Sequence, residues 1–105
     1  MHILIVKFRS ELAEPVVQQL LQQRLPAVFA APGLLQKYYT REASTGDYVG
    51  VHLFDSEKSL ECYRNCEISQ SLPLVYRTTA QPRVEVLQVL FQLRPELEES
   101  GTRGM

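Results

Sequence analysis

The sequence predicts an α+β fold of the ferredoxin-like type, a βαββαβ sandwich in which two helices cover one face of a four-stranded antiparallel sheet. Four apolar runs have the composition of strands, and two amphipathic segments separate them in that order. The strands carry apolar side chains at both odd-numbered and even-numbered positions, so both faces of the sheet are apolar, and the face without helices needs a partner. We therefore expect a homodimer whose two sheets pack face to face as an α/β barrel.

The first strand and the first helix occupy the beginning of the chain. Residues 2–8, HILIVKF, are dense in β-branched and aliphatic residues, which is typical of a central strand. Pro15 suits the first position of a helix, and an apolar stripe follows at helical spacing: Val16, Val17, Leu20, Leu21 and Leu25. We expect Pro26 to kink or restart this helix, and Phe29 to turn inward.

A hairpin and a second helix should follow. Residues 34–41 and 48–54 have strand composition, and the polar residues 42–47, EASTGD, can form the turn between them. The second strand of this hairpin leads directly into a helix. Asp55 and Ser56 can accept hydrogen bonds from the free amides of its first turn.

The pattern weakens after the second helix. Residues 68–76 can add a helical turn that Pro73 ends, and residues 83–93, RVEVLQVLFQL, should be the last strand. We expect one domain over residues 1–94. Residues 95–105 are acidic and then glycine-rich, which predicts a flexible tail.

Composition argues against several classes of protein. The net charge is −1, and the basic residues are scattered rather than clustered, so nucleic acid is not an expected partner. The apolar run at the amino terminus is too short for a signal peptide, and no other run approaches the length of a membrane span. We therefore expect a cytoplasmic protein without a membrane partner.

The sequence predicts neither a metal nor a cofactor. Cys62 and Cys66 are four residues apart on the expected helix, but zinc needs two further ligands, and His2 and His52 have no metal-type spacing to the pair. We therefore expect these cysteines to be small, partly buried residues on a packing face. Glycine-rich phosphate loops, GxSxG, HExxH and flavin or nicotinamide fingerprints are absent from the sequence.

Two segments, APGLLQKYYT at 31–40 and DYVGVHLFDSEKSLECYR at 47–64, carry a family resemblance. They resemble the core of the YdhR-type monooxygenase-like proteins, in the dimeric α/β-barrel superfamily that includes the antibiotic biosynthesis monooxygenases. The matching positions are Pro32, Gly33, Lys37, Gly50, His52, Leu53, Phe54, Glu57, Lys58 and Ser59.

This resemblance implies a cofactor-independent monooxygenase. Such an enzyme deprotonates an electron-rich phenol and lets the carbanion react directly with oxygen, so it needs an apolar pocket, a base and donors for the oxyanion. His52 is the best base candidate, because its ordinary pKa is near neutrality and its neighbours are apolar. The candidates for substrate binding are Phe8, Phe29, Tyr38, Gly50, Phe54, Tyr63, Tyr76 and Arg77.

Other roles stay open for the same residues. His52 can be a hydrogen-bonded histidine of the core or of an interface, and tyrosines often pack their rings while their hydroxyls contact water. The chain can then be a non-catalytic dimer that binds a hydrophobic small molecule or another protein. Haem is a third possibility, with His52 or His2 as its axial ligand.

Overall fold

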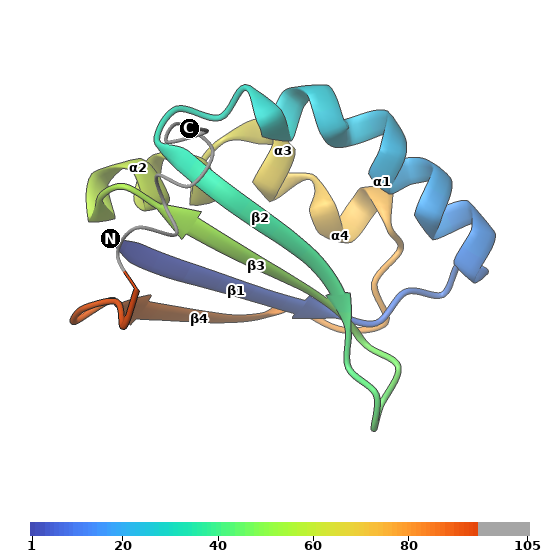
Figure 1. Ribbon diagram of the computed structural model, residues 1–105. Coiled ribbons are helices and arrows are strands. Elements are labelled where there is room, and N and C mark those ends of the chain that lie inside the picture. The colour runs from blue at the N-terminus through green and yellow to red at the C-terminus, as the bar shows by residue number, and fades with distance from the viewer. Residues whose placement is uncertain (95–105) are drawn as a thin grey trace, which may run out of the picture.

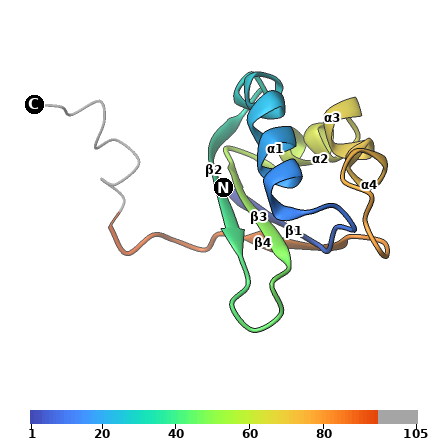
Figure 2. The same ribbon diagram turned by 90° about the vertical axis from the view of Figure 1, so that its right-hand side faces the viewer.

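The predicted ferredoxin-like fold is confirmed by a computed structural model, which describes residues 1–94. Four antiparallel strands form one sheet in the order β2-β3-β1-β4: β1 (His2–Phe8), β2 (Leu34–Arg41), β3 (Tyr48–Phe54) and β4 (Arg83–Gln88). All helices lie on one face of this sheet (Figures 1 and 2): α1 (Glu14–Phe29), α2 (Glu57–Arg64), α3 (Glu67–Gln70) and α4 (Leu72–Val75).

The strand register decides which side chains face the helices. His52 on β3 lies opposite Leu4 on β1 and opposite Lys37 on β2. Because directly opposed residues of antiparallel strands share a face, these three side chains project to the same side. An irregularity between Leu34 and Gln36 shifts the register of β2, so its odd-numbered residues face the helices beyond that point.

Two apolar clusters fill the space between helices and sheet. One contains Leu4, Phe54, Leu60 and Tyr63, and the other contains Phe8, Val17 and Tyr76. The candidate site lies between these two clusters.

The first helix differs from its prediction at its carboxyl end. α1 continues through Pro26 to Phe29 as one helix, and the Ala30 amide donates to the Pro26 carbonyl at 3.1 Å. A proline this near the end costs the helix one hydrogen bond and leaves the following turn intact. The prediction that Phe29 turns inward is wrong: its side chain is 91% exposed while that of Val28 is buried. Adjacent residues of a helix are about 100° apart, so both cannot face the sheet.

The second helical region consists of three short helices rather than one. Ser56 is the N-cap of α2, as predicted, and its Oγ accepts from the Ser59 amide at 3.1 Å. Cys62 is exposed and Cys66 is half-buried at the start of α3. Pro73 does not end a helix but lies in the first turn of α4, where its missing amide has no helical partner.

The last strand is shorter than the predicted 83–93. β4 ends at Gln88, which is opposite His2, the first residue of β1. The Val89 amide still donates to the Met1 carbonyl at 2.9 Å, and beyond it β1 offers no backbone to pair with. Residues 89–94 therefore leave the sheet, and the predicted tail at 95–105 lies outside the described residues.

A glycine at the end of α1 holds a tight corner, so we expect Gly33→Ala to destabilise the fold. Gly33 has φ +77°, and a Cβ there would lie 2.1 Å from Ser59 Oγ and 2.6 Å from Asp55 Oδ1. Strain and overpacking together should cost more than about 2 kcal/mol of unfolding free energy. Urea unfolding measures the loss.

Gly46→Ala is the matched control for this prediction. Gly46 has φ +78°, but the nearest atom to its added Cβ is 3.8 Å away. The Gly46→Ala variant should lose only the free energy of forcing alanine into a left-handed backbone conformation, about 1 kcal/mol. Equal losses in the two variants would show that the contact with α2 is unimportant.

Candidate functional site

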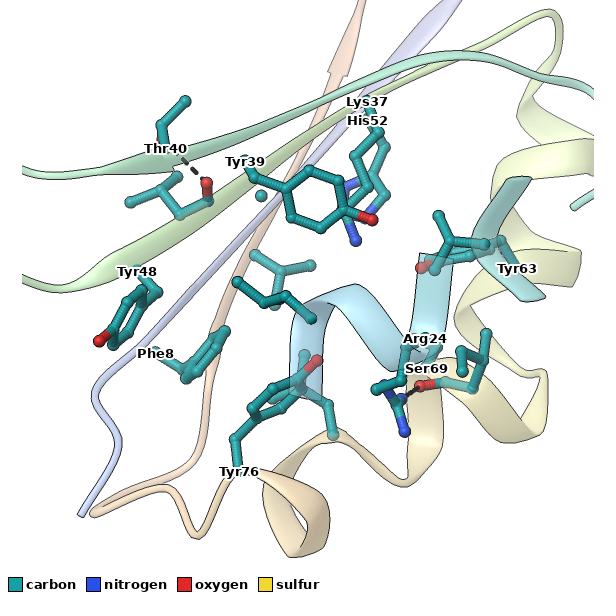
Figure 3. A pocket seen from close by; sticks show the side chains of 17 residues that line it. Phe8, Arg24, Lys37, Tyr39, Thr40, Tyr48, His52, Tyr63, Ser69 and Tyr76 are labelled. Atoms are coloured by element: carbon teal, nitrogen blue, oxygen red, sulfur yellow. Dashed lines mark hydrogen bonds between the residues drawn. The ribbon is translucent and has the colours of Figure 1, made fainter. Parts of the chain in front are cut away.

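A cavity of about 60 Å³ lies between the sheet and the helices (Figure 3). Much of its wall is aliphatic, from residues on β1, α1, α3 and α4: Val6, Leu21, Val28, Ile68 and Leu72. The polar side chains that line it are Arg24, Lys37, Tyr39, Tyr48, His52, Tyr63, Ser69 and Tyr76. Thr40 and Val49 also border the cavity, although their side chains lie on the other face of the sheet. The cavity is thus an apolar space with a few polar groups, which is the usual composition of a small-molecule site.

His52 has a fixed orientation in this wall. Its ring is 2% exposed, and Nδ1 lies 3.0 Å from the Leu4 carbonyl oxygen on the neighbouring strand. A carbonyl only accepts hydrogen bonds, so Nδ1 carries the proton and the lone pair of the neutral ring is on Nε2. The rings of Phe54, at 6.2 Å, and Tyr63, at 5.1 Å between centroids, pack against the imidazole.

Burial, and then the positive charge of Lys37, lower the pKa of His52 to about 4. The ring is therefore neutral at pH 7, with Nε2 free to accept a hydrogen bond or a proton. A phenol with a pKa near that of tyrosine would give up its proton to this ring only at a cost of about 8 kcal/mol. Proton transfer at this site consequently requires that the resulting anion be stabilised.

Gly50 leaves the edge of the imidazole uncovered. A Cβ at Gly50 would lie 3.0 Å from Cε1 of His52 and 3.7 Å from Nε2, and 3.4 Å from Cε of Lys37. Even one methyl group would therefore crowd the ring. The missing side chain keeps space beside the Nε2 lone pair.

Lys37 lies beside His52 on β2. Its Nζ is 4.4 Å from the centroid of the Tyr39 ring, which is a cation–π contact at the edge of the cavity. Burial, and then the positive charge of Arg24, lower the pKa of Lys37 to about 8. Most of the lysine is charged at pH 7, and a minor fraction is neutral and able to accept a proton.

Arg24 reaches the cavity from α1 on the opposite side. Its guanidinium donates to the Ile68 carbonyl and to Ser71 Oγ, the latter at 3.3 Å. It also lies over the Tyr76 ring, with 5.5 Å between Cζ and the ring centroid. The segment that contains α3 and α4 thus holds the guanidinium in place (Figure 3).

Three tyrosines add hydroxyl groups around the same space. Tyr63 and Tyr76 are buried, and Tyr39, 41% exposed, lies at the rim. Burial raises the pKa of Tyr39, Tyr63 and Tyr76. The hydroxyls are therefore protonated at neutral pH and can donate to an anion.

The structure brings together five of the nine predicted site residues. Phe8, Gly50, His52, Tyr63 and Tyr76 all line the cavity. They come from β1, β3, α2 and the end of α4, so the fold gathers residues that are far apart in the sequence.

The other four predicted residues do not line this cavity, which corrects the prediction. Tyr38 lies opposite Val51 on the other face of the sheet, and Phe29 projects outward from the end of α1. Phe54 is fully buried in the core, behind His52. Arg77 is exposed in the connection after α4, where its φ of 49° marks a turn.

Arg24, Lys37 and Tyr39 were not among the predicted site residues. Arg24 follows four exposed glutamines on the polar side of α1, but its own side chain reaches the Ile68 carbonyl and Ser71 Oγ, which the sequence pattern did not reveal. Both the odd-numbered and the even-numbered residues of β2 include apolar and polar side chains, so the sequence pattern does not indicate which set faces the helices. The pairing of Lys37 with His52 across the hairpin was the available signal.

We expect the stability of the protein to fall as the pH is lowered from 6.5 to 4. The folded pKa of His52 is below the unfolded value of 6.5, so the unfolded chain binds the proton first. Stability is complete above pH 6.5 and should decrease by about 2 kcal/mol at pH 5 and about 3 kcal/mol at pH 4. Urea unfolding at pH 7.5, 6 and 5 measures this slope.

His52→Asn is the control for the pH prediction. Asn Nδ2 can donate to the Leu4 carbonyl as Nδ1 does, but it does not titrate. The variant should lose most of the slope between pH 7.5 and 5. An unchanged slope would assign the pH dependence to other groups.

Residues 1–94 contain neither a cluster of metal-ligating side chains nor a helix that could span a membrane. No three or more histidine, cysteine, aspartate or glutamate side chains of this part of the chain gather as metal ligands. No helix formed by these residues has both the length and the apolar composition needed to cross a bilayer.

The fold is shared with several solved structures. Rv0793 from Mycobacterium tuberculosis superposes with a TM-score of 0.70 and 19% identity over 88% of this chain and 97% of that one. An antibiotic biosynthesis monooxygenase superposes with a TM-score of 0.69 and 14% identity, over 87% of this chain and 100% of that one. A variant of SnoaB, a cofactor-independent oxygenase from Streptomyces nogalater, superposes with a TM-score of 0.69 and 12% identity, over 88% of this chain and 95% of the SnoaB chain.

Similarity to other proteins is thus visible in the backbone rather than in the sequence. No protein-family model and no curated protein matches the sequence itself. At the identities found, the superpositions establish how the chain is folded and leave its chemistry to be argued from its own residues. The chain has the fold of the antibiotic biosynthesis monooxygenases, as its sequence resemblance predicted.

Proposed function

We propose that this chain is a cofactor-independent monooxygenase of the YdhR type that acts on an apolar aromatic molecule held between helices and sheet. The observation that carries the proposal is the Nε2 lone pair of His52, next to the space above Gly50 in an apolar cavity. The similarity of the fold to that of SnoaB, a cofactor-independent oxygenase, supports the same reaction class.

The proposed reaction starts with transfer of the phenol proton to Nε2 of His52. Electron density in the phenolate ring then adds to oxygen at a ring carbon, which gives a hydroperoxide. Loss of water from that carbon gives a quinone, so a phenol and one oxygen molecule become a quinone and one water molecule. Lys37 and the tyrosine hydroxyls stabilise the negative charge as it forms, which offsets the weak basicity of His52.

The size of the cavity limits the substrate to at most a single ring. Its volume of about 60 Å³ is below the roughly 150 Å³ of an engineered cavity that binds benzene. One ring can be accommodated if Tyr39, which lies at the rim, moves outward. A fused polycyclic molecule would require the helices to separate from the sheet.

Oxygen consumption tests the proposal. Purified protein, treated with a chelator and stripped of bound cofactors, is mixed with 4-methoxyphenol, catechol or hydroquinone in an oxygen electrode. We expect uptake above the protein-free rate with at least one phenol, with one oxygen molecule consumed per quinone formed and no hydrogen peroxide released. Rates equal to the protein-free rate for all three phenols would contradict the proposal.

A non-catalytic binding module is the second candidate. The low pKa of His52 and its bond to the Leu4 carbonyl also suit a histidine that only orients a ligand. This function predicts that the phenols bind, as seen by NMR, without any oxygen uptake.

A homodimer through the open face of the sheet is part of the proposal. That face carries a continuous set of apolar side chains: Ile3, Ile5, Tyr38, Val49, Val51, Leu53 and Leu87. Beyond β4, Leu90, Phe91 and Leu93 are also more than four-fifths exposed. A second copy would cover both surfaces. Light scattering should therefore give twice the 12.0 kDa mass of the chain, and a monomer at micromolar concentration would exclude this partner.

A further inference from the structure

The cavity contains two cations without a carboxylate partner. Arg24 and Lys37 both line it, and no aspartate or glutamate does so within the described part of the chain. Four other basic residues there form ion pairs with carboxylates: Lys7 with Glu42, Arg9 with Asp47, Arg41 with Glu14, and Arg64 with Glu61. Lys58, Arg77 and Arg83 form no ion pair with the described residues either, but they are exposed to solvent. Arg24 and Lys37 are therefore distinguished by being both unpaired and partly buried at the cavity.

An unpaired cation in an apolar cavity is costly. Removing it from water without an opposite charge costs free energy, and proteins usually pair or neutralise such groups. The lowered pKa of Lys37 reflects this cost, since burial and the charge of Arg24 both disfavour its charged form. A bound anion would remove the penalty for both side chains.

The polar groups of the cavity also differ in their hydrogen-bonding capacity. Arg24 and Lys37 are donors only, and the hydroxyls of Tyr39, Tyr63 and Tyr76 can donate while they are protonated. Nε2 of His52 is an acceptor on the same wall as Lys37. The arrangement suits a ligand that carries both a carboxylate and a hydroxyl group.

We propose that the ligand of this cavity is a single-ring aromatic acid, with its carboxylate bound by Lys37 and Arg24 and its phenol hydroxyl directed at His52. This inference rests on the proposed function and specifies its substrate class. The carboxylate supplies a fixed negative charge before any proton is transferred. That charge next to His52 raises the basicity of the ring in the complex, which is what the proposed reaction needs.

Benzoate and benzamide, which have the same shape and differ in charge, test the inference. Their dissociation constants for the full chain are measured by NMR titration at pH 7. We expect benzoate to bind at least about tenfold more tightly, which corresponds to about 1.4 kcal/mol. The inference would be overturned if the two ligands bound equally or if benzamide bound more tightly. It would also be overturned if benzoate did not bind at a concentration of about 10 mM.

Two lysine variants locate the charge that is responsible. Lys37→Met keeps the length of the side chain and removes its charge, and it should reduce the preference for benzoate to less than about threefold. Lys58→Met makes the same change on the exposed surface of α2 and should leave the preference unchanged. A full preference in Lys37→Met would overturn the assignment of Lys37.

The wild-type protein provides a test that does not depend on the folding of a variant. Benzoate affinity should fall several-fold between pH 7 and pH 9, because Lys37 loses its charge around pH 8. The other groups facing it are Arg24, which stays charged, His52, which is already neutral, and tyrosines whose pKa values are raised: Tyr39, Tyr63 and Tyr76. A flat benzoate profile over this range would overturn the role of Lys37.

The binding and oxygen-uptake experiments fail independently. A preference for benzoate without oxygen uptake from any phenol would support the acid-binding site and exclude the monooxygenase. Oxygen uptake from neutral phenols without a preference for benzoate would support the monooxygenase and exclude the acid-binding site.

Discussion

His52→Asn should reduce phenol-dependent oxygen uptake by about 10²- to 10⁴-fold, the range expected for loss of a general base. The substitution keeps a donor for the Leu4 carbonyl at the position of Nδ1 and removes only the Nε2 side of the ring. Circular dichroism should show that the variant is folded. The initial rate in an oxygen electrode measures the effect.

The other histidine provides a matched control for this variant. His2→Asn makes the same chemical change at the end of β1, outside the residues that line the cavity. It should keep the wild-type rate. A wild-type rate in His52→Asn would remove His52 from the mechanism, whereas loss of folding would give it a structural role.

Gly50→Val should abolish ligand binding and oxygen uptake by filling the space beside His52. The first added carbon would already lie 3.0 Å from Cε1 of the ring, and the two further methyl groups would occupy the cavity itself. We expect the rate to fall more than about 100-fold, as happens when reacting groups are displaced by about 1 Å. Unfolding free energy should change by less, since overpacking costs about 1–3 kcal/mol and valine is favoured in strands.

Gly50→Ala separates crowding from blockage. Its single Cβ requires the His52 ring to shift by a few tenths of an ångström while most of the cavity stays open. Its oxygen-uptake rate should therefore lie between those of wild type and Gly50→Val. Full activity in Gly50→Val would show that the reaction takes place elsewhere.

The strands and the central histidine could be predicted because short-range patterns determine them. The turn at 42–47 pairs β2 with β3, and the alternation along β3 puts Gly50 and His52 on one face. The residues that join them from β1 and α2 follow from the ferredoxin-like topology.

The cationic part of the site could not be predicted, because it depends on two long-range features. The register shift near Leu34 determines that Lys37 rather than Tyr38 faces the helices, and the composition of β2 is mixed on both faces. The position of Arg24 depends on the Ile68 carbonyl, 44 residues away in the sequence. Contacts of this kind leave no periodic pattern in the sequence.

The imidazole nitrogens of His52 provide the most direct test of the central claim, that this ring presents a lone pair to a ligand site. Long-range proton–nitrogen NMR of protein labelled with ¹⁵N-histidine reports the charge and tautomer of the ring. At pH 7 we expect a neutral ring with its proton on Nδ1, and a shift of the Nε2 signal on addition of 4-hydroxybenzoate. A charged ring at pH 7, a proton on Nε2, or an Nε2 signal that does not respond to 4-hydroxybenzoate would contradict the claim.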